Sequence, residues 1–410
     1  MQRRENYLYV GMDLHKQSHT AVLLNCWNEK LEVIVIENKP SEFKKLADKV
    51  NRKARQLELS PIYGLENAYG YGRSLAVWLI EKGYVVKDIN PALAYDQRKS
   101  APTFQKNDEY DAWCVGTVLI NQLHSLPDAK PEDNHWTLSQ LVNRRDLLVK
   151  DGIRFKNGLH EQVSIAYPSY HKFFSEIDGK TALYFWKTYP SPLYLQDKTA
   201  GELAEELREI SRSFKQVKAE LILDCIQKDG NTIRDYQDSR DFLTRSLARD
   251  LEHQMEEKGR LEKEIEKVLS SFDYKLTSMP GIGTAVASKL IVEIGDIRRF
   301  PNADKLARFA GIAPVKFSSA GKGKEQSSRQ GKLHGLFYFL AVTMVSVPKT
   351  GIPNHPVFHS YFMRKIGEGK TKSQALVCIM RRLVNIIYGM MKNKTEYREQ
   401  IVPNQPQEEQ

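Results

Sequence analysis

The sequence predicts an α/β domain at the start of the chain and mainly helical structure after it. Up to about residue 120, short runs rich in β-branched and aromatic residues alternate with segments of helical periodicity. Beyond that point the apolar residues recur every three or four positions, which is the spacing of one helix face. A polar stretch at 127–137, broken by Pro127 and Pro131, predicts a boundary between the two parts.

The first part contains strands and helices in the order β-β-β-α-β-α-β-α. The first three strands are separated by short turns, so an antiparallel meander is expected. The expected elements are strands at 7–13, 20–24 and 31–36, a helix at 41–57, a strand at 61–66, a helix at 71–82, a strand at 84–89 and a last helix from Asp108. This order is that of the ribonuclease H fold.

Four acidic residues stand where this fold would bring them together. Asp13 ends the first strand, and Glu66 ends the strand expected beside it. Asp108 and Asp111 are three residues apart at the start of the last helix, so they share a helix face. Phosphodiester chemistry with two divalent ions about 3.5–4 Å apart needs several hard carboxylate oxygens. Together the four acids therefore predict a metal site.

Each acid also has a structural explanation. Asp108 could cap the helix N-terminus, and Asp111 could lie in the first turn to favour the helix dipole. Asp13 could begin a turn. The coincidence of all four on this strand order is what favours the metal site.

The middle of the chain is expected to be helical, with helices at 138–166, 201–228 and 238–271. The last two would form an antiparallel coiled-coil arm joined by a turn at 229–231, or two amphipathic helices packed on their own domain. The expected domains are 1–130, the ribonuclease H-type domain; 131–272, the helical and coiled-coil region; 273–395, a mainly α-helical C-terminal domain; and 396–410, a disordered tail.

Cysteine usage and hydropathy bound the compartment. The four cysteines, Cys26, Cys114, Cys225 and Cys378, show no CxxC spacing, so reduced thiols are expected rather than a zinc site or disulfides. The sequence contains no run of 18 apolar residues, so no transmembrane helix is expected, and the N-terminus has no secretory pattern. We therefore expect a cytoplasmic protein associated with the nucleoid and without a membrane partner.

The positive charge is concentrated in the C-terminal part. The formal net charge is +10, and residues 281–395 contain 19 Lys/Arg against 5 Asp/Glu. Such a one-ended excess predicts a polyanionic partner, since phosphate contacts release condensed counterions. A solvated basic surface that aids solubility is the alternative.

Two C-terminal segments are candidate nucleic-acid elements. The turn at 280–283 is typical of a helix-hairpin-helix motif, in which Gly281 and Gly283 would let the backbone approach a phosphate; a tight turn in a helical core is the alternative. A loop of small and basic residues at 309–324 contains Ser318 and Ser319. A serine hydroxyl becomes a nucleophile when metal ions or Lys/Arg stabilise its alkoxide, and otherwise such a loop contacts phosphate or stays flexible.

The combined motifs resemble the DEDD transposases of the insertion sequence 110 family, relatives of the Piv-type DNA invertases. The resemblance covers about residues 7–390. The matching segments are VGMDLHK at 10–16, GLEN at 64–67, the KxDxxDA pattern at 106–112, the Pro-Gly-Ile-Gly turn at 280–283 and AGIAPVKFSS at 310–319.

The resemblance implies site residues and a cofactor. The N-terminal domain would be RuvC-like, and Asp13, Glu66, Asp108 and Asp111 would hold one or two Mg²⁺ ions, for which Mn²⁺ could substitute. Ser319, or the adjacent Ser318, would attack the DNA backbone and form a phosphoserine link. The expected nucleic-acid contacts are Gly281, Gly283, Lys316, Lys322, Lys324 and Arg329. The sequence departs from the family where Ala320 precedes Gly321, and where 331–336 lacks the usual Gly-Asn and Leu-Arg pairs.

The resemblance also implies partners. Donor and target DNA would be cut and rejoined without ATP hydrolysis by a homo-oligomer, a dimer or tetramer, whose active sites combine two subunits. A structured RNA encoded by the element would specify both DNA sites by base pairing.

Three other functions fit parts of the sequence. A Holliday-junction resolvase would use the same acids with water as the nucleophile. A non-catalytic nucleic-acid-binding protein could retain the fold. An actin- or hexokinase-like phosphotransferase also ends its first strand in an acid, but the basic C-terminus and the lack of a clear glycine-rich phosphate loop argue against it.

Overall fold

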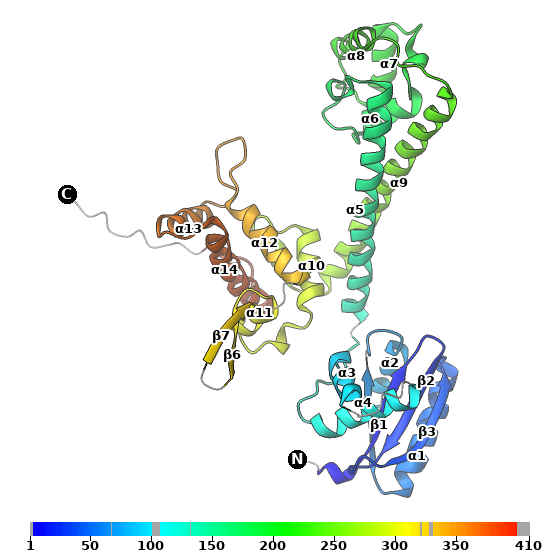
Figure 1. The fold of residues 1–410 in the computed structure, drawn as a ribbon, viewed down its shortest axis with the longest axis vertical. Helices are drawn as coiled ribbons and strands as arrows, with labels where there is room; N and C mark the ends of the chain where they lie inside the picture. Colours follow the sequence, from blue (N-terminus) through cyan, green and yellow to red (C-terminus); the bar gives the residue numbers. More distant parts are fainter. Residues whose placement is uncertain are drawn as a thin grey trace, which may run out of the picture. The chain divides into compact units, whose positions relative to one another are not determined.

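The computed structural model describes residues 3–66, 68–100, 107–131, 133–319, 322–327 and 331–399, with the backbone alone at 133, 314–319 and 322–327. The chain forms two compact units, an N-terminal unit at 1–136 and a C-terminal unit at 137–410 (Figure 1). Each unit is built around two hydrophobic clusters of its own.

A five-stranded mixed sheet forms the centre of the N-terminal unit. Its strand order is β3-β2-β1-β4-β5. The first three strands pair antiparallel, and β4 and β5 run parallel to β1. The strands are β1 (Tyr7–Leu14), β2 (Ser18–Leu24), β3 (Lys30–Glu37), β4 (Ser60–Glu66) and β5 (Val85–Ile89). The predicted meander and ribonuclease H-like sheet are confirmed.

Helices cover both faces of this sheet (Figure 1). Alternate residues of β1 point to opposite faces: Leu8 and Val10 pack with α1 (Pro40–Gln56) and α2 (Arg73–Glu81). Tyr9 packs on the other face with α3 (Pro91–Lys99) and α4 (Asp108–Gln122). Asp13, an even number of residues after Tyr9, belongs to this second face.

Helix α3 was not expected from the sequence, which predicted no element between the strand at 84–89 and the helix from Asp108. The Asn90 side chain accepts a hydrogen bond from the backbone N–H of Ala92 at 2.9 Å, and Pro91 occupies the first helical position. Both are signals of a helix start.

Two glycines allow α4 to lie directly on β1. A Cβ on Gly11 would come within 2.3 Å of the Ala112 carbonyl oxygen and of the Gly116 nitrogen. A Cβ on Gly116 would come within 2.5 Å of a Leu24 methyl carbon. No side chain fits between the two backbones, so these glycines fix how closely the start of α4 approaches the end of β1.

Two long antiparallel helices dominate the C-terminal unit. They are α5 (Asp133–Ala166) and α9 (Gln237–Ser270). Arg145 of α5 donates to Glu262 of α9 from Nε at 2.9 Å, and its Nη2 lies 2.8 Å from the same oxygen. The C-terminal half of α5 and the N-terminal half of α9 share one hydrophobic cluster, and their other halves share a second.

The first of these clusters contains α6 (Lys180–Thr188), α7 (Ala200–Ile210) and α8 (Gln216–Asp229). The predicted single helix at 201–228 is wrong, since Ser211 leaves the helical conformation and ends α7. The long partner of α9 is α5, not this segment. Leu203 and Leu207 of α7 pack with Phe185 and Trp186 of α6 rather than in a coiled-coil seam with α9.

The second cluster is formed by the remaining helices. They are α10 (Thr284–Ile294), α11 (Ala303–Phe309), α12 (Lys332–Val345), α13 (Pro356–Gly367) and α14 (Lys372–Asn393). The 3₁₀ turns of the chain are η1 (Arg4–Asn6), η2 (Tyr170–Lys172), η3 (Pro192–Leu195), η4 (Leu276–Ser278) and η5 (Ile297–Arg299). Among the described helices, only α14 is long and apolar enough to cross a membrane. Half of its apolar stretch is buried within the protein.

The serine-containing segment is not a loop. Strands β6 (Pro314–Ser319) and β7 (Lys322–Ser327) pair antiparallel as a hairpin, which corrects the expectation of an irregular loop. The predicted disordered tail is described only up to Glu399. There Tyr397 donates its backbone N–H to Ser278 Oγ at 2.8 Å, and its hydroxyl lies 3.0 Å from His355 Nε2. Residues 400–410 lie outside the described part.

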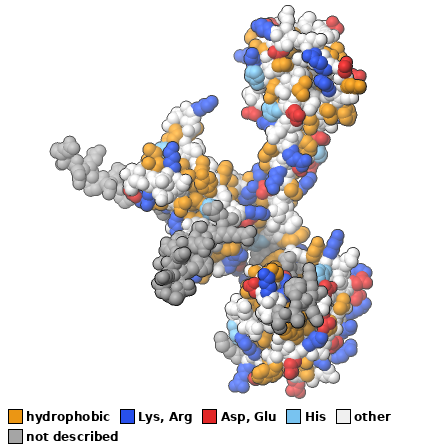
Figure 2. Space-filling view, in the orientation of Figure 1, with side chains coloured by type: hydrophobic (Ala, Val, Ile, Leu, Met, Phe, Trp, Pro, Cys, Tyr) orange, Lys and Arg blue, Asp and Glu red, His pale blue; other side chains and the backbone are white. Residues whose placement is uncertain are grey.

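One surface of the C-terminal unit is apolar. Hydrophobic side chains gather over α12 in Figure 2, where Tyr338, Phe339 and Val342 are 47%, 56% and 37% exposed. We call these three residues the α12 face. Large exposed apolar groups in a row favour a contact with another macromolecule.

Candidate active site

Asp13 and Glu66 meet at one edge of the sheet. Met12 of β1 lies opposite Leu65 of β4 in parallel register, so the residues that follow them, Asp13 and Glu66, reach the same edge. Both carboxylates are largely buried, with side chains 12% and 17% exposed. The pairing explains why two acids 53 positions apart in the sequence come together in the fold.

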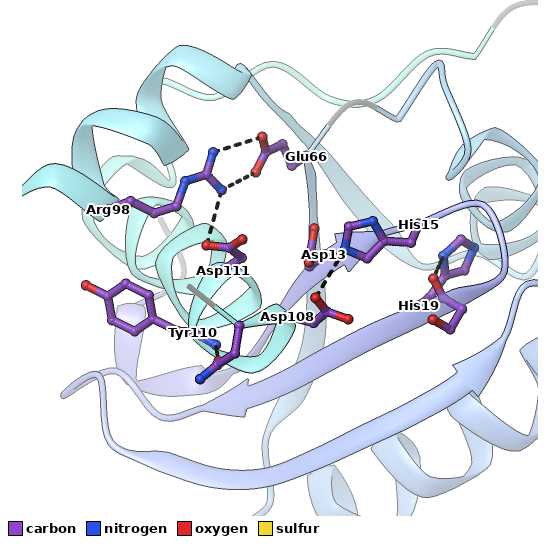
Figure 3. Close-up of polar contacts among 10 residues, drawn as sticks. Asp13, His15, His19, Glu66, Arg98, Asp108, Tyr110 and Asp111 are labelled. Carbon is purple, nitrogen blue, oxygen red and sulfur yellow. Dashed lines mark hydrogen bonds and ion pairs between the residues drawn. The ribbon is translucent and has the colours of Figure 1, made fainter. Parts of the chain in front are cut away.

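The first turn of α4 contributes the other two acids (Figure 3). The N-cap is Asn107, whose side chain accepts the Tyr110 backbone N–H at 2.6 Å. The alternative role for Asp108 as the cap is therefore wrong, since Asp108 is the first residue inside the helix. Asp111, one turn further, has a side chain 15% exposed, whereas Asp108 is 58% exposed.

A histidine lies between Asp13 and Asp108. His15 Nε2 is 3.0 Å from Asp13 Oδ2 and 3.4 Å from Asp108 Oδ1 (Figure 3). These three residues offer ligand atoms that all lie within 4.8 Å of one another.

An arginine lies between Glu66 and Asp111. Arg98 donates from Nη1 to Glu66 Oε2 at 3.2 Å and from Nη2 to Glu66 Oε1 at 3.4 Å. Its Nη1 is also 3.6 Å from Asp111 Oδ1. Burial is the largest single influence and lowers the pKa of Arg98, but the hydrogen bond and charge of Glu66, together with the charge of Asp111, outweigh it and raise that pKa. The four acids thus form two pairs, and each pair has a basic side chain beside it, His15 or Arg98.

The electrostatics of the site disfavour an ionised Asp13. Burial is the largest cause that raises the pKa of Asp13, and the carboxylates of Asp111, Asp108 and Glu66 act in the same direction, against His15. Buried oxygens of Asp13 and Asp111 also accept no hydrogen bond among the described residues. His15 Nε2 lies 3.0 Å from the Asp13 oxygen and Arg98 Nη1 lies 3.6 Å from the Asp111 oxygen, so each has a basic neighbour but no hydrogen bond. Clustered carboxylates that repel each other and leave such oxygens without a hydrogen bond fit a divalent cation, because the cation would satisfy both needs.

The donor set narrows the choice of cation. Carboxylate oxygens suit Mg²⁺, Ca²⁺ and Mn²⁺, and an imidazole suits the transition metals. The carboxylates and the imidazole together therefore fit a divalent cation, and the expected Mg²⁺ or Mn²⁺ stays a prediction.

The candidate serines lie at the end of β6. In the hairpin register Ser319 is opposite Lys322 and Ser318 is opposite Gly323. The side chains of both serines and of Lys316, Lys322 and Lys324 lie outside the described part, and so does all of Arg329. Their roles stay predictions.

The turn at 280–283 is anchored in the helical core. Met279 and Ile282 are 1% and 3% exposed. Gly281 has a φ of +84°, and a Cβ there would lie 3.0 Å from Met344 Cε. Gly283 is the N-cap of α10. This geometry explains why a glycine stands at position 281 and favours the core-turn alternative. Phosphate contacts by Gly281 and Gly283 stay a prediction.

The two basic residues of the site, His15 and Arg98, were not predicted from the sequence. His15 was noticed only as part of a motif, although its position two residues after Asp13 is a signal, because residues i and i+2 of an extended chain point the same way. Arg98 had no signal, since it lies on the unexpected helix α3.

The comparisons with known proteins agree with this architecture. A DEDD transposase profile of IS110 elements, described as "Transposase", matches residues 10–168, and the profile of the "Transposase IS116/IS110/IS902 family" matches residues 273–361. The 43.6 kDa protein of insertion element IS110 from Streptomyces coelicolor is 26% identical over 72% of this chain and 73% of its own length.

Two further relatives extend the likeness. The 44.8 kDa protein of insertion element IS116 from Streptomyces clavuligerus is 24% identical over 96% of this chain and 97% of its own length. The pilin gene-inverting protein of Moraxella bovis is 32% identical over 31% of this chain and 38% of its own length.

The fold and the acidic site define a DEDD-type recombinase, a class of DNA-cleaving enzyme that uses a divalent metal site. The chain belongs to the IS110/IS116/IS900 family of transposases, to which the Piv-like inversion recombinases are related.

Proposed function

We propose that this transposase cuts DNA at a Mg²⁺ site formed by Asp13, Glu66, Asp108 and Asp111, with Mn²⁺ as a substitute. The supporting observation is the meeting of four carboxylates from three elements, with buried oxygens of Asp13 and Asp111 that accept no hydrogen bond in the described part of the chain. A bound divalent ion supplies charge stabilisation for the attacking and leaving oxygens of a phosphodiester.

The four acids differ in how exposed their side chains are, and this difference suggests a different role for each. Asp13 and Asp111 are the buried acids and would anchor the cation. Asp108 is the exposed acid and lies on the side open to solvent, from which a DNA strand would approach. His15 holds the Asp13 and Asp108 carboxylates near each other through its Nε2.

We propose Ser319 as the nucleophile, with Ser318 as the neighbouring candidate. Its hydroxyl oxygen would bond to phosphorus while a deoxyribose oxygen leaves and takes up a proton, which gives a phosphoserine link. Attack by the hydroxyl of another strand would reverse this step and rejoin DNA without ATP. The support is the position of Ser319 at the end of β6, inside the residues matched by the family profile.

The proposed partners are donor and target DNA, an element-encoded guide RNA and a second copy of the chain. The basic excess at 281–395 supports nucleic-acid binding, because it is concentrated in one part of the chain. The exposed α12 face supports a contact between subunits. Light scattering of the purified protein, alone and with DNA, checks whether it is a dimer or tetramer.

The decisive experiment is a recombination assay on end-labelled DNA that carries the junctions of the element. Wild type should leave a labelled protein–DNA adduct after denaturation, and Ser319→Ala should leave none while Ser318→Ala does. Cleavage by Ser319→Ala at the wild-type rate, with hydrolysed ends, would instead support the resolvase with water as nucleophile.

The guide RNA is tested in the same assay. Transcripts of the noncoding DNA that flanks the gene should be required for recombination. Substitutions in their loops should redirect the DNA sites by base pairing. Full activity of ribonuclease-treated protein would contradict the guided mechanism.

A further inference from the structure

Arg98 occupies an unusual position for a cation in an acidic site. It lies in the last turn of α3, its side chain is 19% exposed, and it faces Glu66 and Asp111 (Figure 3). Both of its terminal nitrogens donate to Glu66, at 3.2 and 3.4 Å, and one lies 3.6 Å from Asp111. One guanidinium therefore engages half of the acids proposed to bind metal.

The positive charge beside one pair of acids depends on protonation, whereas the charge beside the other pair is permanent. Asp13 and Asp108 share His15, which is charged only when protonated. Glu66 and Asp111 share a guanidinium, which keeps its charge at every physiological pH. Four neighbouring carboxylates repel one another, and a largely buried guanidinium costs desolvation that only its partners offset. Arg98 and these two acids therefore stabilise each other while no metal is bound.

Building on the proposed function of the acids, we propose that Arg98 is the resident counter-cation of the metal-free site. It holds Glu66 and Asp111 together before metal loads, and it competes with divalent cations for these two carboxylates. A cation that takes both acids as ligands displaces the guanidinium from them. Arg98 is thus a positioning residue that sets how tightly the free enzyme holds metal.

The competition predicts the sign of a measurable effect. Removing the charge of Arg98 leaves Glu66 and Asp111 unpaired, so a divalent cation should bind more tightly than in the wild type. If Arg98 merely built the geometry of the site, its removal would weaken metal binding or leave it unchanged. The direction of the change in affinity separates the two roles.

The chain offers a matched control on strand β5. Lys87 has a side chain 17% exposed and pairs with Asp128 at 2.7 Å, so it resembles Arg98 in burial and in having a carboxylate partner. Its partner is not one of the four acids. Lys87→Met therefore removes a comparable ion pair from the same unit and leaves the metal site intact.

The experiment is a titration of the full-length, metal-free protein with Mn²⁺, in which electron paramagnetic resonance counts the free ion. We expect Arg98→Met to bind Mn²⁺ at least about tenfold more tightly than wild type, because a neighbouring unit charge is gone. Arg98→Lys keeps a positive charge and should stay close to wild type, as should Lys87→Met. Equal or weaker binding by Arg98→Met would overturn the inference.

Thermal unfolding provides the second readout and guards against a misfolded variant. Arg98→Met should melt below wild type in EDTA, and Mn²⁺ should recover most of that difference, whereas Lys87→Met should melt below wild type by the same amount with and without Mn²⁺. If wild type binds Mn²⁺ and Arg98→Met binds no more tightly, only the role of Arg98 fails. If neither protein binds Mn²⁺, the metal site of the proposed function fails together with it.

Discussion

Two buried aspartates, one in each unit, are treated in opposite ways. Asp241 of α9 is 1% exposed, and its two oxygens accept hydrogen bonds from Gln237 at 2.8 Å and from Ser191 at 3.1 Å. Asp13 is 9% exposed and lies beside three other acids, and its buried Oδ2 accepts no hydrogen bond among the described residues. Neutral donors satisfy the first carboxylate, whereas the second has His15 Nε2 at 3.0 Å from Oδ2 but accepts no hydrogen bond there and faces three other acids.

The contrast separates a structural acid from a functional one. Buried polar atoms in folded proteins are almost always hydrogen-bonded, so each exception needs an explanation. At Asp241 the fold supplies the donors and gains stability. At Asp13 the fold places a buried carboxylate beside three other acids with His15 as its one basic neighbour among the described residues, which indicates that further positive charge is supplied from outside the chain.

The largest expected effect is on catalysis. Asp13→Asn should lower recombination by at least about a thousandfold, because a cation ligand contributes several kcal/mol of charge stabilisation. Asp241→Asn should stay within about twofold of wild type, given enough folded protein. The plasmid recombination assay measures both, and activity of Asp13→Asn at the wild-type level would remove the distinction between the two acids.

The next effect tests how α4 is positioned against Asp13. Gly11→Ala would place a Cβ 2.3 Å from backbone atoms of α4, which cannot move as a side chain can. We expect a loss of roughly 3 kcal/mol in the free energy of unfolding of the N-terminal unit, together with loss of cleavage. Urea unfolding measures the first quantity.

Gly152→Ala is the matched control for this substitution. Gly152 lies within α5 and a Cβ there meets nothing within 4 Å, so alanine should stabilise that helix by about 0.5–1 kcal/mol. If Gly11→Ala were as well tolerated as Gly152→Ala, the close approach of α4 to β1 would be wrong.

The acids of the N-terminal unit could be located from sequence because their signals are local. Asp13 and Glu66 end recognisable strands, and the strand order of the fold then places those ends side by side. Asp108 and Asp111 need only the three-residue spacing of a helix face. What could not be seen was Arg98, whose partners lie on other elements and whose helix was not expected.

The C-terminal unit shows where such reasoning fails. An amphipathic stripe indicates that a helix has a partner but not which one. One of the two alternatives therefore paired the helix at 238–271 with 201–228, although α9 packs along α5. The segment at 314–327 is rich in small and charged residues, which gives little strand signal. Its hairpin is held by backbone pairing between the two strands, which the amino-acid composition does not predict.

A moderate effect is expected when Asp241 loses its carboxylate. Asp241→Ala leaves the buried hydroxyl of Ser191 and the amide of Gln237 without their acceptor. The free energy of unfolding should fall by about 2–3 kcal/mol, the usual cost of unsatisfied buried groups. Asp241→Asn keeps one acceptor oxygen and should lose less in the same urea titration, so an equal loss in both variants would argue against this account.

A smaller effect is expected at the helix cap that precedes the site. Asn107→Ala removes the acceptor of the Tyr110 backbone N–H and should cost about 1 kcal/mol. Because Asp108 and Asp111 lie in the turn that this cap fixes, Mn²⁺ binding should weaken as well. Glycine at 107 should cost less stability than alanine, and a cost that alanine and glycine share equally would contradict the capping role.

The smallest effect concerns the stability of the metal-free protein. The pKa of Asp13 is raised, chiefly by burial, so the folded state binds its proton more readily than the unfolded chain does. Its stabilising contribution is present below the unfolded pKa and is lost as the pH rises through the folded pKa. At neutral pH Asp13→Asn should therefore raise the melting temperature in EDTA, and the gain should shrink on acidification. A lower melting temperature would contradict the unfavourable arrangement at Asp13.

The most direct measurement is an anomalous diffraction map of crystals soaked in Mn²⁺. We predict a peak bounded by the carboxylates of Asp13, Glu66, Asp108 and Asp111, and its loss in Asp13→Asn crystals. Soaked crystals that show no peak among these acids, with Arg98 still bound to Glu66, would contradict a metal-dependent site in this transposase.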